Sequence, residues 1–335
     1  NSKDSSSILG LLCDRFPRIL PSFPPTGFPN QGNTCYANSS IKFLIGIVGV
    51  DPLIEHLHAV QQGLDANTSP AEAAAIEKFS QLLGQMKKGE AIDIRDFWES
   101  LASTRIFAGF DFYQMNDAQE FLAKLDTLLQ LQNLAGSSVR VQETLINGQA
   151  MRDGTGYQTF SHDVSVLGTS ATLQDIANLG VASEKVEIKW AYGDTVNTEV
   201  EKKRQLVADF QSFTRFNLHI NALQYDEKTD SMIKLDLQNT DFTRRVTLPI
   251  VDSRSGEAWQ VTLEPRDIII HSGSATGGHY YMYSKEDDKH WVVHNDSAVR
   301  VENKVDTAAQ AKFISFAVVD RTRTSPDTEP MALGG

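Results

Sequence analysis

The stretch GFPNQGNTCYANSSIKFL, residues 27–44, places one of the chain's two cysteines, Cys35, directly before an apolar run. A helix that begins at or just after Thr34 would direct its unpaired N–H groups and the positive end of its dipole at the Cys35 thiol, which favours the thiolate. Asn33 and Thr34 are residue types that cap helices, and Gly32 permits a sharp turn before the helix. The stretch predicts a nucleophile, against the alternative that Cys35 is a small buried apolar residue.

Asn30 precedes Cys35 on the loop that enters this helix. From there its side-chain amide can reach the oxygen of a carbonyl group that the thiolate attacks. With the backbone N–H of Cys35 it would form an oxyanion hole. The alternative for an asparagine between Pro29 and Gln31 is a simple turn residue.

The stretch HYYMYSKEDDKHWVVHN, residues 279–295, predicts a hairpin, because two β-rich segments flank a polar turn. If the turn centres on Asp287, His279 and Asn295 are equidistant from it and face each other. Cross-strand partners lie about 5 Å apart at Cβ, so the Asn295 amide oxygen can accept from one imidazole nitrogen. The other nitrogen is then free to act as a base. Gly277 and Gly278 permit a loop that approaches a substrate backbone closely.

Other histidines lie near His279, and a surface or core position is more common for histidine than a catalytic one. His290 and His294 alternate with apolar residues and have no comparable partner across the turn. His271 precedes the hairpin. We therefore take His279 as the candidate base.

The chain divides into a helical part and a strand-rich part. Apolar residues recur at helical intervals between about Asn33 and Gln132, and alternating, β-branched runs follow Ala135. Helices followed by strands predict an α+β fold. We expect residues 1–26, which are rich in proline towards their end, to be an extended lead-in and residues 321–335 to be a disordered tail.

Composition narrows the class of protein. The 335 residues are 41% hydrophobic and 22% charged, which is typical of a globular, soluble protein, and no apolar run approaches the length of a membrane span. Two cysteines cannot supply a disulfide framework or a four-thiolate zinc site, and they favour a reducing compartment. The net charge of −12 disfavours nucleic acid and anionic membranes as partners. We expect no cofactor.

Three stretches together resemble the motifs of the ubiquitin-specific proteases. Residues 27–44 are similar to their Cys box, G-L-x-N-x-G-N-T-C-Y-x-N-S. GGHYYMYSKEDDKHWVVHNDSAV is similar to their His box, G-H-Y-x-x-Y followed by W and N-D-x-x-V, and YQMNDAQEFLAKLDTLL to their Q-D-A-x-E-F-L box. The resemblance implies a papain-like hand, with a helical thumb over 27–135, fingers and part of the palm over about 136–260, and the rest of the palm over 261–320.

The resemblance also implies roles for single residues. Cys35 would be the nucleophile, His279 the general base and Asn295 the residue that orients it. Asn30 would be the side-chain donor of the oxyanion hole, with Asp296 as a supporting neighbour. The activity implied is that of a thiol-dependent deubiquitinase, a monomer whose partner is ubiquitin or a ubiquitinated protein.

Further matched positions concern the substrate. Asp117 and Glu120 match acidic positions that grip the arginine-bearing C-terminal tail of ubiquitin, and carboxylates at i and i+3 of a helix can pair with guanidinium groups. Without the resemblance, a solvated helix face would be the simpler interpretation. Gly277, Gly278 and Tyr280 are candidate walls of a narrow channel for the terminal glycines.

The sequence departs from the family pattern in several places. It lacks the two C-x-x-C pairs that often bind zinc in the fingers, where QAMRDGTGYQ and AYGDTVNTEV stand instead, so we expect metal-free fingers. Asn116 replaces the usual Gln before Asp117. This divergence fits a bacterial effector acting in the host cytosol as well as a divergent eukaryotic member acting in its own cytosol. A ubiquitin-binding pseudoenzyme and a papain-like acyltransferase are the alternative functions.

Overall fold

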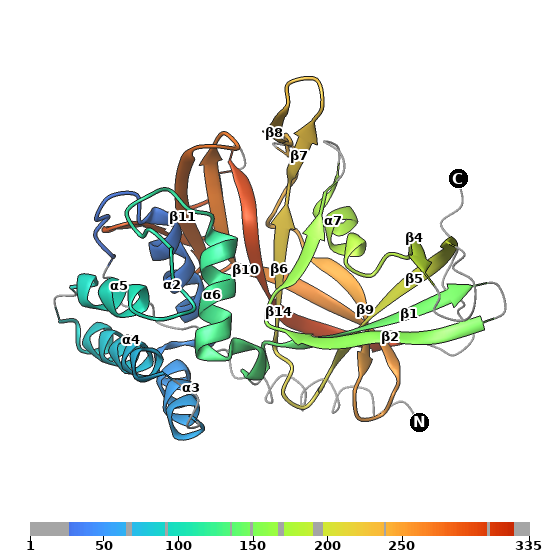
Figure 1. Ribbon diagram of the computed structural model, residues 1–335, viewed down its shortest axis with the longest axis horizontal. Coiled ribbons are helices and arrows are strands. Elements are labelled where there is room, and N and C mark those ends of the chain that lie inside the picture. Colours follow the sequence, from blue (N-terminus) through green and yellow to red (C-terminus); the bar gives the residue numbers. More distant parts are fainter. Residues whose placement is uncertain are drawn as a thin grey trace, which may run out of the picture.

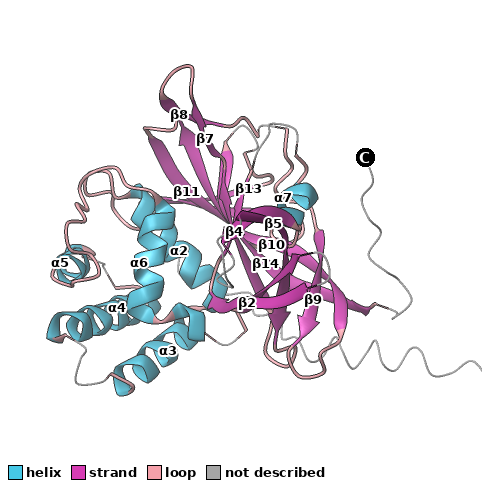
Figure 2. Ribbon diagram, turned by 45° about the vertical axis from the view of Figure 1, so that its right-hand side comes forward, coloured by secondary structure: helices cyan, strands magenta, loops and turns pink. Residues whose placement is uncertain are grey.

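The computed structural model describes residues 27–64, 69–90, 93–134, 136–147, 150–166, 171–189, 197–237, 239–306 and 309–324. Helices gather on one side of the molecule and strands on the other (Figures 1 and 2). The predicted lead-in, 1–26, lies outside the described residues. The helical side, which corresponds to the predicted thumb, contains α2 (Cys35–Val48), α3 (Val50–Gln62), α4 (Pro70–Lys88), α5 (Arg95–Ala102) and α6 (Ala118–Leu129).

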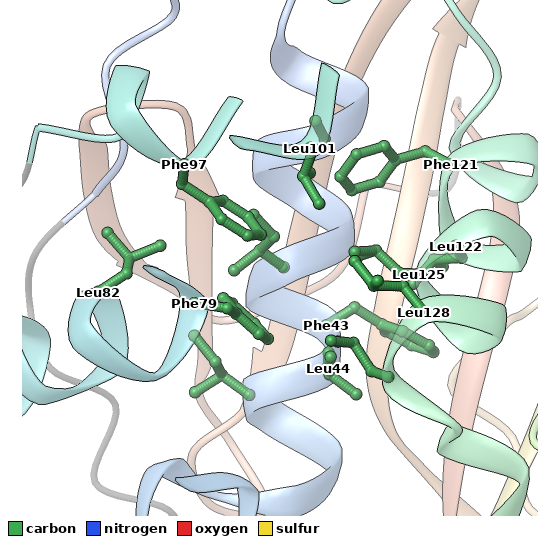
Figure 3. Close-up of a cluster of buried hydrophobic side chains, with 14 of the residues drawn as sticks. Phe43, Leu44, Phe79, Leu82, Phe97, Leu101, Phe121, Leu122, Leu125 and Leu128 are labelled. Atoms are coloured by element: carbon green, nitrogen blue, oxygen red, sulfur yellow. The ribbon is translucent and has the colours of Figure 1, made fainter. Parts of the chain in front are cut away.

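Helix α2 is the centre of the helical side. Every residue from Cys35 to Ile47 is buried, so neighbours surround this helix on all faces. Phe43 also reaches the strands, where its ring centroid lies 5.7 Å from that of Phe313. The cluster in Figure 3 includes Phe43 and Leu44 from α2, Phe79 and Leu82 from α4, Phe97 and Leu101 from α5, and Phe121, Leu122, Leu125 and Leu128 from α6. This packing fixes the position of the first residue of α2.

Within the described ranges, no single helix is long and apolar enough to cross a membrane. Helices α2 and α3 meet that criterion only when taken together, and they are bent by 97° at their junction.

A twelve-stranded sheet forms most of the other side, and its main path runs β13-β12-β11-β10-β9-β5-β1-β2. Strand β14 pairs with β10 and β6, β3 pairs with β6, and β4 pairs with β5. A small helix, α7 (Leu173–Leu179), and a separate hairpin, β7 (Leu223–Asp226) with β8 (Ser231–Lys234), accompany the sheet. The sheet strands are β1 (Val139–Asn147), β2 (Ala150–Thr159), β3 (His162–Ser165), β4 (Glu184–Lys189), β5 (Asn197–Ala208), β6 (Arg215–Asn221), β9 (Val246–Asp252), β10 (Ala258–Gly273), β11 (Gly278–Lys285), β12 (Trp291–Asn295), β13 (Ala298–Glu302) and β14 (Gln310–Arg323).

The ends of the predicted regions need one correction. Strand β14 continues to Arg323 and pairs there with Trp259, so the first residues of the expected disordered tail belong to the sheet. Alternation of apolar residues ends near Val319, which is why the sequence pattern stops short of the strand's end. Residues 325–335 lie outside the described part. The fingers segments 149–158 and 191–200 also contain residues whose side chains are not described, so metal-free fingers stay a prediction.

The hairpin that carries the two predicted triad members forms, but its register differs from the prediction. Met282 pairs with His294, and in this register Asn295 lies opposite Tyr281 rather than opposite His279. The shift is two residues, so the side chains of His279 and Asn295 still project from the same face. They meet as diagonal neighbours, a separation that long side chains can bridge.

The turn itself explains this shift. The Asp287 carboxylate accepts hydrogen bonds from the backbone N–H groups of Lys289 and His290, at 2.7 and 2.9 Å. The Glu286 N–H closes the turn on the His290 carbonyl, at 3.0 Å. The turn therefore centres one residue later than the sequence symmetry suggested.

Candidate active site

Cys35 is the first residue of α2, and only 3% of its surface is exposed. The chain reaches it through a tight turn in which Gly32 and Asn33 have φ angles of +95° and +56°. Thr34 occupies the N-cap position without a side-chain capping bond. The predicted helix start is therefore correct, and the unpaired N–H groups of the first turn lie next to the sulfur.

His279 connects Cys35 to the hairpin. Its Nε2 lies 2.7 Å from Asn295 Oδ1, which leaves Nδ1 for Cys35. The hydrogen bond with Cys35 is the largest of the influences that raise the pKa of His279 to about 9; burial opposes it, and Asn295 and the charges of Cys35 and Asp296 add to it. At neutral pH the imidazole is therefore protonated and lies beside the sulfur. The structure brings the three predicted triad residues together from opposite ends of the chain.

Asp296 joins three segments around this triad. Its Oδ2 lies 4.0 Å from His279 Nε2 and accepts from Asn30 Nδ2 at 3.0 Å, and its Oδ1 accepts from Asn38 Nδ2 at 2.8 Å. Its backbone carbonyl accepts from the Phe28 N–H at 3.0 Å. Asp296 itself has a left-handed φ of +52°, a conformation that surrounding contacts must hold. The carboxylate therefore ties the loop before α2, α2 itself and the hairpin to one another.

Asn30 is oriented by its own loop. Its Oδ1 accepts from the backbone N–H groups of Gly32 and Thr34, both at 3.1 Å. These bonds turn Nδ2 towards Asp296, and one of its two hydrogens is donated there. Asn30 is exposed, and it lies on the loop directly before the Cys35 turn. Its role in an oxyanion hole stays a prediction.

The predicted substrate residue Asp117 already has internal partners. It is the N-cap of α6 and accepts from the Gln119 N–H at 2.7 Å. Its Oδ2 also accepts from Lys312 Nζ at 3.1 Å and from the Tyr280 hydroxyl at 3.4 Å. Tyr280 is itself buried and stacks on His271, with ring centroids 4.4 Å apart. These contacts hold the thumb helix to two palm strands.

The remaining predicted substrate residues differ in their surroundings. Glu120 is exposed, and its carboxylate lies 3.9 Å from Lys124 Nζ. A Cβ on Gly278 would lie 2.3 Å from the Ser272 carbonyl, so this glycine permits the close approach of two backbone segments. Gly277 has no such neighbour within 3.4 Å. The substrate roles of these residues stay predictions.

Two polar residues of this region were not predicted. Asn38 lies one helical turn after Cys35 and is buried, and its match to the last N of the Cys box was the available signal. Lys312 stands within the apolar run AKFISFAVV, where a lone lysine indicates a buried partner. Neither partner could be named from the sequence, because both are distant in the chain.

Comparison with known proteins identifies the family. Residues 26–316 match the family described as Ubiquitin carboxyl-terminal hydrolase. The chain belongs to this family. The membership predicted from the three motifs is thereby confirmed.

Two curated relatives of the ubiquitin carboxyl-terminal hydrolase family are similar to this chain over most of its length. It is 25% identical over 289 residues to Ubiquitin carboxyl-terminal hydrolase 7 of Drosophila melanogaster. The aligned region covers 82% of this chain and 24% of that protein. It is 23% identical over 332 residues to Ubiquitin carboxyl-terminal hydrolase 21 of Arabidopsis thaliana. Here the aligned region covers 90% of this chain and 43% of that protein. The chain thus spans less than half the length of either relative.

Solved structures in the comparison share the fold. The SAGA Ubp8/Sgf11/Sus1/Sgf73 DUB module bound to ubiquitin aldehyde matches with a TM-score of 0.64 and 14% identity, over 94% of this chain and 75% of that chain. The SAGA DUB module bound to monoubiquitin matches with a TM-score of 0.62 and 16% identity, again over 94% of this chain and 75% of that chain. The predicted α+β fold is confirmed.

Proposed function

We propose that this chain hydrolyses the bond that follows the C-terminal glycine of ubiquitin, through a thioester on Cys35. The hydrogen-bonded series of Cys35, His279 and Asn295 at the start of a buried helix carries the proposal. Family membership and similar folds solved with ubiquitin aldehyde and monoubiquitin support ubiquitin as the partner. A cytosolic site of action is part of the proposal and rests on the sparse cysteines.

In the first half of the reaction, the Cys35 sulfur attacks the carbonyl carbon of the terminal glycine. The Cys35 N–H and the second Nδ2 hydrogen of Asn30 stabilise the negative oxygen that forms. The C–N bond then breaks, and the protonated His279 gives its proton to the departing amine. The lysine-bearing product leaves, and the modifier remains as a thioester.

In the second half, the now neutral His279 takes a proton from water, which attacks the thioester carbonyl. The C–S bond breaks, the modifier leaves as a carboxylic acid that gives its proton to solvent, and the thiolate and imidazolium are restored. Asn295 accepts from Nε2 throughout, so the imidazole presents Nδ1 to the reacting atoms in both halves. An ester bond to the modifier fits the same sequence of steps, with an alcohol in place of the amine.

The test uses a ubiquitin probe with a C-terminal electrophile, together with isopeptide-linked and ester-linked ubiquitin substrates. We expect the probe to form a covalent adduct with the wild-type chain, seen by intact mass, and Cys35→Ala to bind ubiquitin without forming it. Cys13→Ala is the control, because it removes the chain's other thiol. Binding without an adduct in the wild type would favour the pseudoenzyme, and full cleavage by Cys35→Ala would refute the mechanism.

A further inference from the structure

A small cavity lies between the thumb and the palm, beside the predicted catalytic hairpin. Its volume is about 140 Å³, and it is bounded by the start of α6 and by β6, β8, β10, β11 and β14. Its lining includes Asp117, Lys234, His271, Tyr280 and Lys312. Gly277 and Tyr280, which line the cavity, lie on either side of His279 in the chain, and the charge of Cys35 acts on Tyr280, so the cavity lies near the predicted catalytic residues.

Lys312 determines the state of the acidic group in this cavity. Lys312 is buried, and its Nζ donates to Asp117 Oδ2 at 3.1 Å. Burial raises the pKa of Asp117, but the Lys312 charge and the hydrogen bond from the Gln119 N–H outweigh it and hold this pKa below its usual value. The carboxylate is thus ionised, neutralised and occupied by donors from its own chain.

Lys234 adds a second positive charge. Its Nζ donates to the backbone carbonyls of His271 and Gly273, at 2.8 and 3.2 Å. Burial and the charge of Lys312 lower the pKa of Lys234 to about 8, so it is still mostly protonated at neutral pH. Burial and both lysines lower the pKa of His271 to about 4, which leaves it neutral.

The cavity therefore has two ammonium groups and one carboxylate among its described lining residues, although the whole chain has a net charge of −12. An arginine from a substrate would meet a carboxylate that already has three donors, and would approach two like charges. A neutral or acidic side chain would meet two cations. One of them, Lys234, has backbone carbonyls and the His271 imidazole as its partners among the described residues. Charge complementarity thus favours a tail with a neutral or acidic side chain at this position.

We propose that Lys312 is a specificity-determining residue, which makes this site accept a modifier tail with a neutral or acidic side chain, rather than arginine, where the tail passes Asp117. This inference rests on the proposed hydrolase function. It differs from the role that the family resemblance implied for Asp117, namely to grip an arginine. Here Lys312 takes the place of the substrate cation.

The experiment measures kcat/KM on fluorogenic ubiquitin with its native tail and on versions in which each tail arginine is replaced in turn by alanine or glutamate. For the wild-type chain we expect at least one such replacement to be cleaved as fast as the native tail or faster. Lys312→Met frees Asp117. In this variant, kcat/KM for the native tail divided by kcat/KM for the glutamate tail should rise roughly tenfold, which corresponds to one charge-assisted hydrogen bond. Lys312→Arg keeps the charge and should keep the wild-type ratio.

Lys285→Met is the matched control, because Lys285 is similarly sheltered and pairs with Glu264 at 3.3 Å, at the far end of β11 from His279. Its ratio should equal that of the wild type. A ratio within one preparation does not depend on the folded fraction, so partial unfolding of Lys312→Met does not imitate the effect.

The outcomes separate the two proposals. An unchanged ratio in Lys312→Met, or a strong wild-type preference for the arginine tail, would overturn this inference while leaving the hydrolase intact. Absence of any adduct between Cys35 and electrophilic probes with the native, alanine and glutamate tails would instead overturn the hydrolase proposal, and this inference with it.

Discussion

Replacing Cys35 with alanine is expected to lower the pKa of His279 from about 9 towards the ordinary histidine value of 6.5, a fall on the order of two units. The reason is that the hydrogen bond with Cys35 is the largest influence raising this pKa, and the sulfur's charge adds to it. Burial of the imidazole, which lowers the pKa, remains in the variant. The Asn295 hydrogen bond and the Asp296 charge also remain, and they keep the value from falling further.

The direction of the pH dependence follows from the form of His279 that its surroundings favour, which is the protonated one in the wild type. A raised pKa means that His279 keeps its proton up to about pH 9 in the wild type, whereas in Cys35→Ala it would lose it near pH 6.5. At pH 7.5 the wild-type imidazole is therefore charged and that of the variant is mostly neutral. In the wild type we also expect kcat/KM to fall as the pH rises through about 9, because the proton for the leaving amine is then lost.

The assay is an NMR titration of the histidine ring protons, with His279 assigned as the signal that is missing in His279→Gln. Asn295→Ala is the comparison variant, because it removes a smaller raising influence and should lower the pKa of His279 by less than Cys35→Ala does. A His279 pKa that stays near 9 in Cys35→Ala would refute the reasoning, because the sulfur would then not be its main partner.

Three further changes have expected outcomes. Asn295→Ala should lower kcat/KM by roughly 10- to 100-fold in steady-state assays, the equivalent of one hydrogen bond to a charged group. Gly27→Ala should destabilise the fold by about 1–3 kcal/mol in thermal unfolding, because its Cβ would lie 2.3 Å from the Asp296 carbonyl. Gly84→Ala, where nothing lies within 4 Å, is its control and should raise the melting temperature. Leu125→Ala, at a fully buried position, should cost about 2–5 kcal/mol in urea unfolding.

The broad fold was predictable because each part of the chain has its own apolar period. Helical spacing marked α4 and α6, and alternation marked the sheet strands, because both periods report which face of an element is buried. Ser69 forms a capping box with Glu72 at the start of α4, so the start of this helix is also encoded locally. These signals are local, so a single sequence contains them.

The register of the catalytic hairpin was not predictable in the same way. The centre of the turn depends on which backbone N–H groups the Asp287 carboxylate accepts, and KEDDK contains more than one acidic side chain that could do so. The contact between His279 and Asn295 was nevertheless predicted, because a shift of two residues preserves the face of a strand. A shift of one residue would have separated the two side chains.

The contacts of Asp117 could not be predicted from the sequence for a different reason. The carboxylate on α6 and the ammonium of Lys312 on β14 are 195 residues apart, and only the packing of the thumb against the palm brings them together. Family motifs gave Asp117 a substrate role, and no motif included Lys312. Charge in a cleft depends on every chain segment that lines it, so a motif from one segment is an incomplete guide to specificity.

The same dependence on distant segments bears on how the predicted active site keeps its geometry. Asp296 accepts hydrogen bonds from Asn30 and Asn38 and holds the backbone of Phe28, while its charge acts on His279. One residue in a strained conformation therefore both positions the candidate oxyanion donor and acts by its charge on the candidate base. The free energy that orients them is supplied by folding of the thumb against the palm, so little reorganisation is left for the reaction itself. Substitutions that disturb the packing of the thumb against the palm should therefore impair such a site as much as substitutions of the reacting residues.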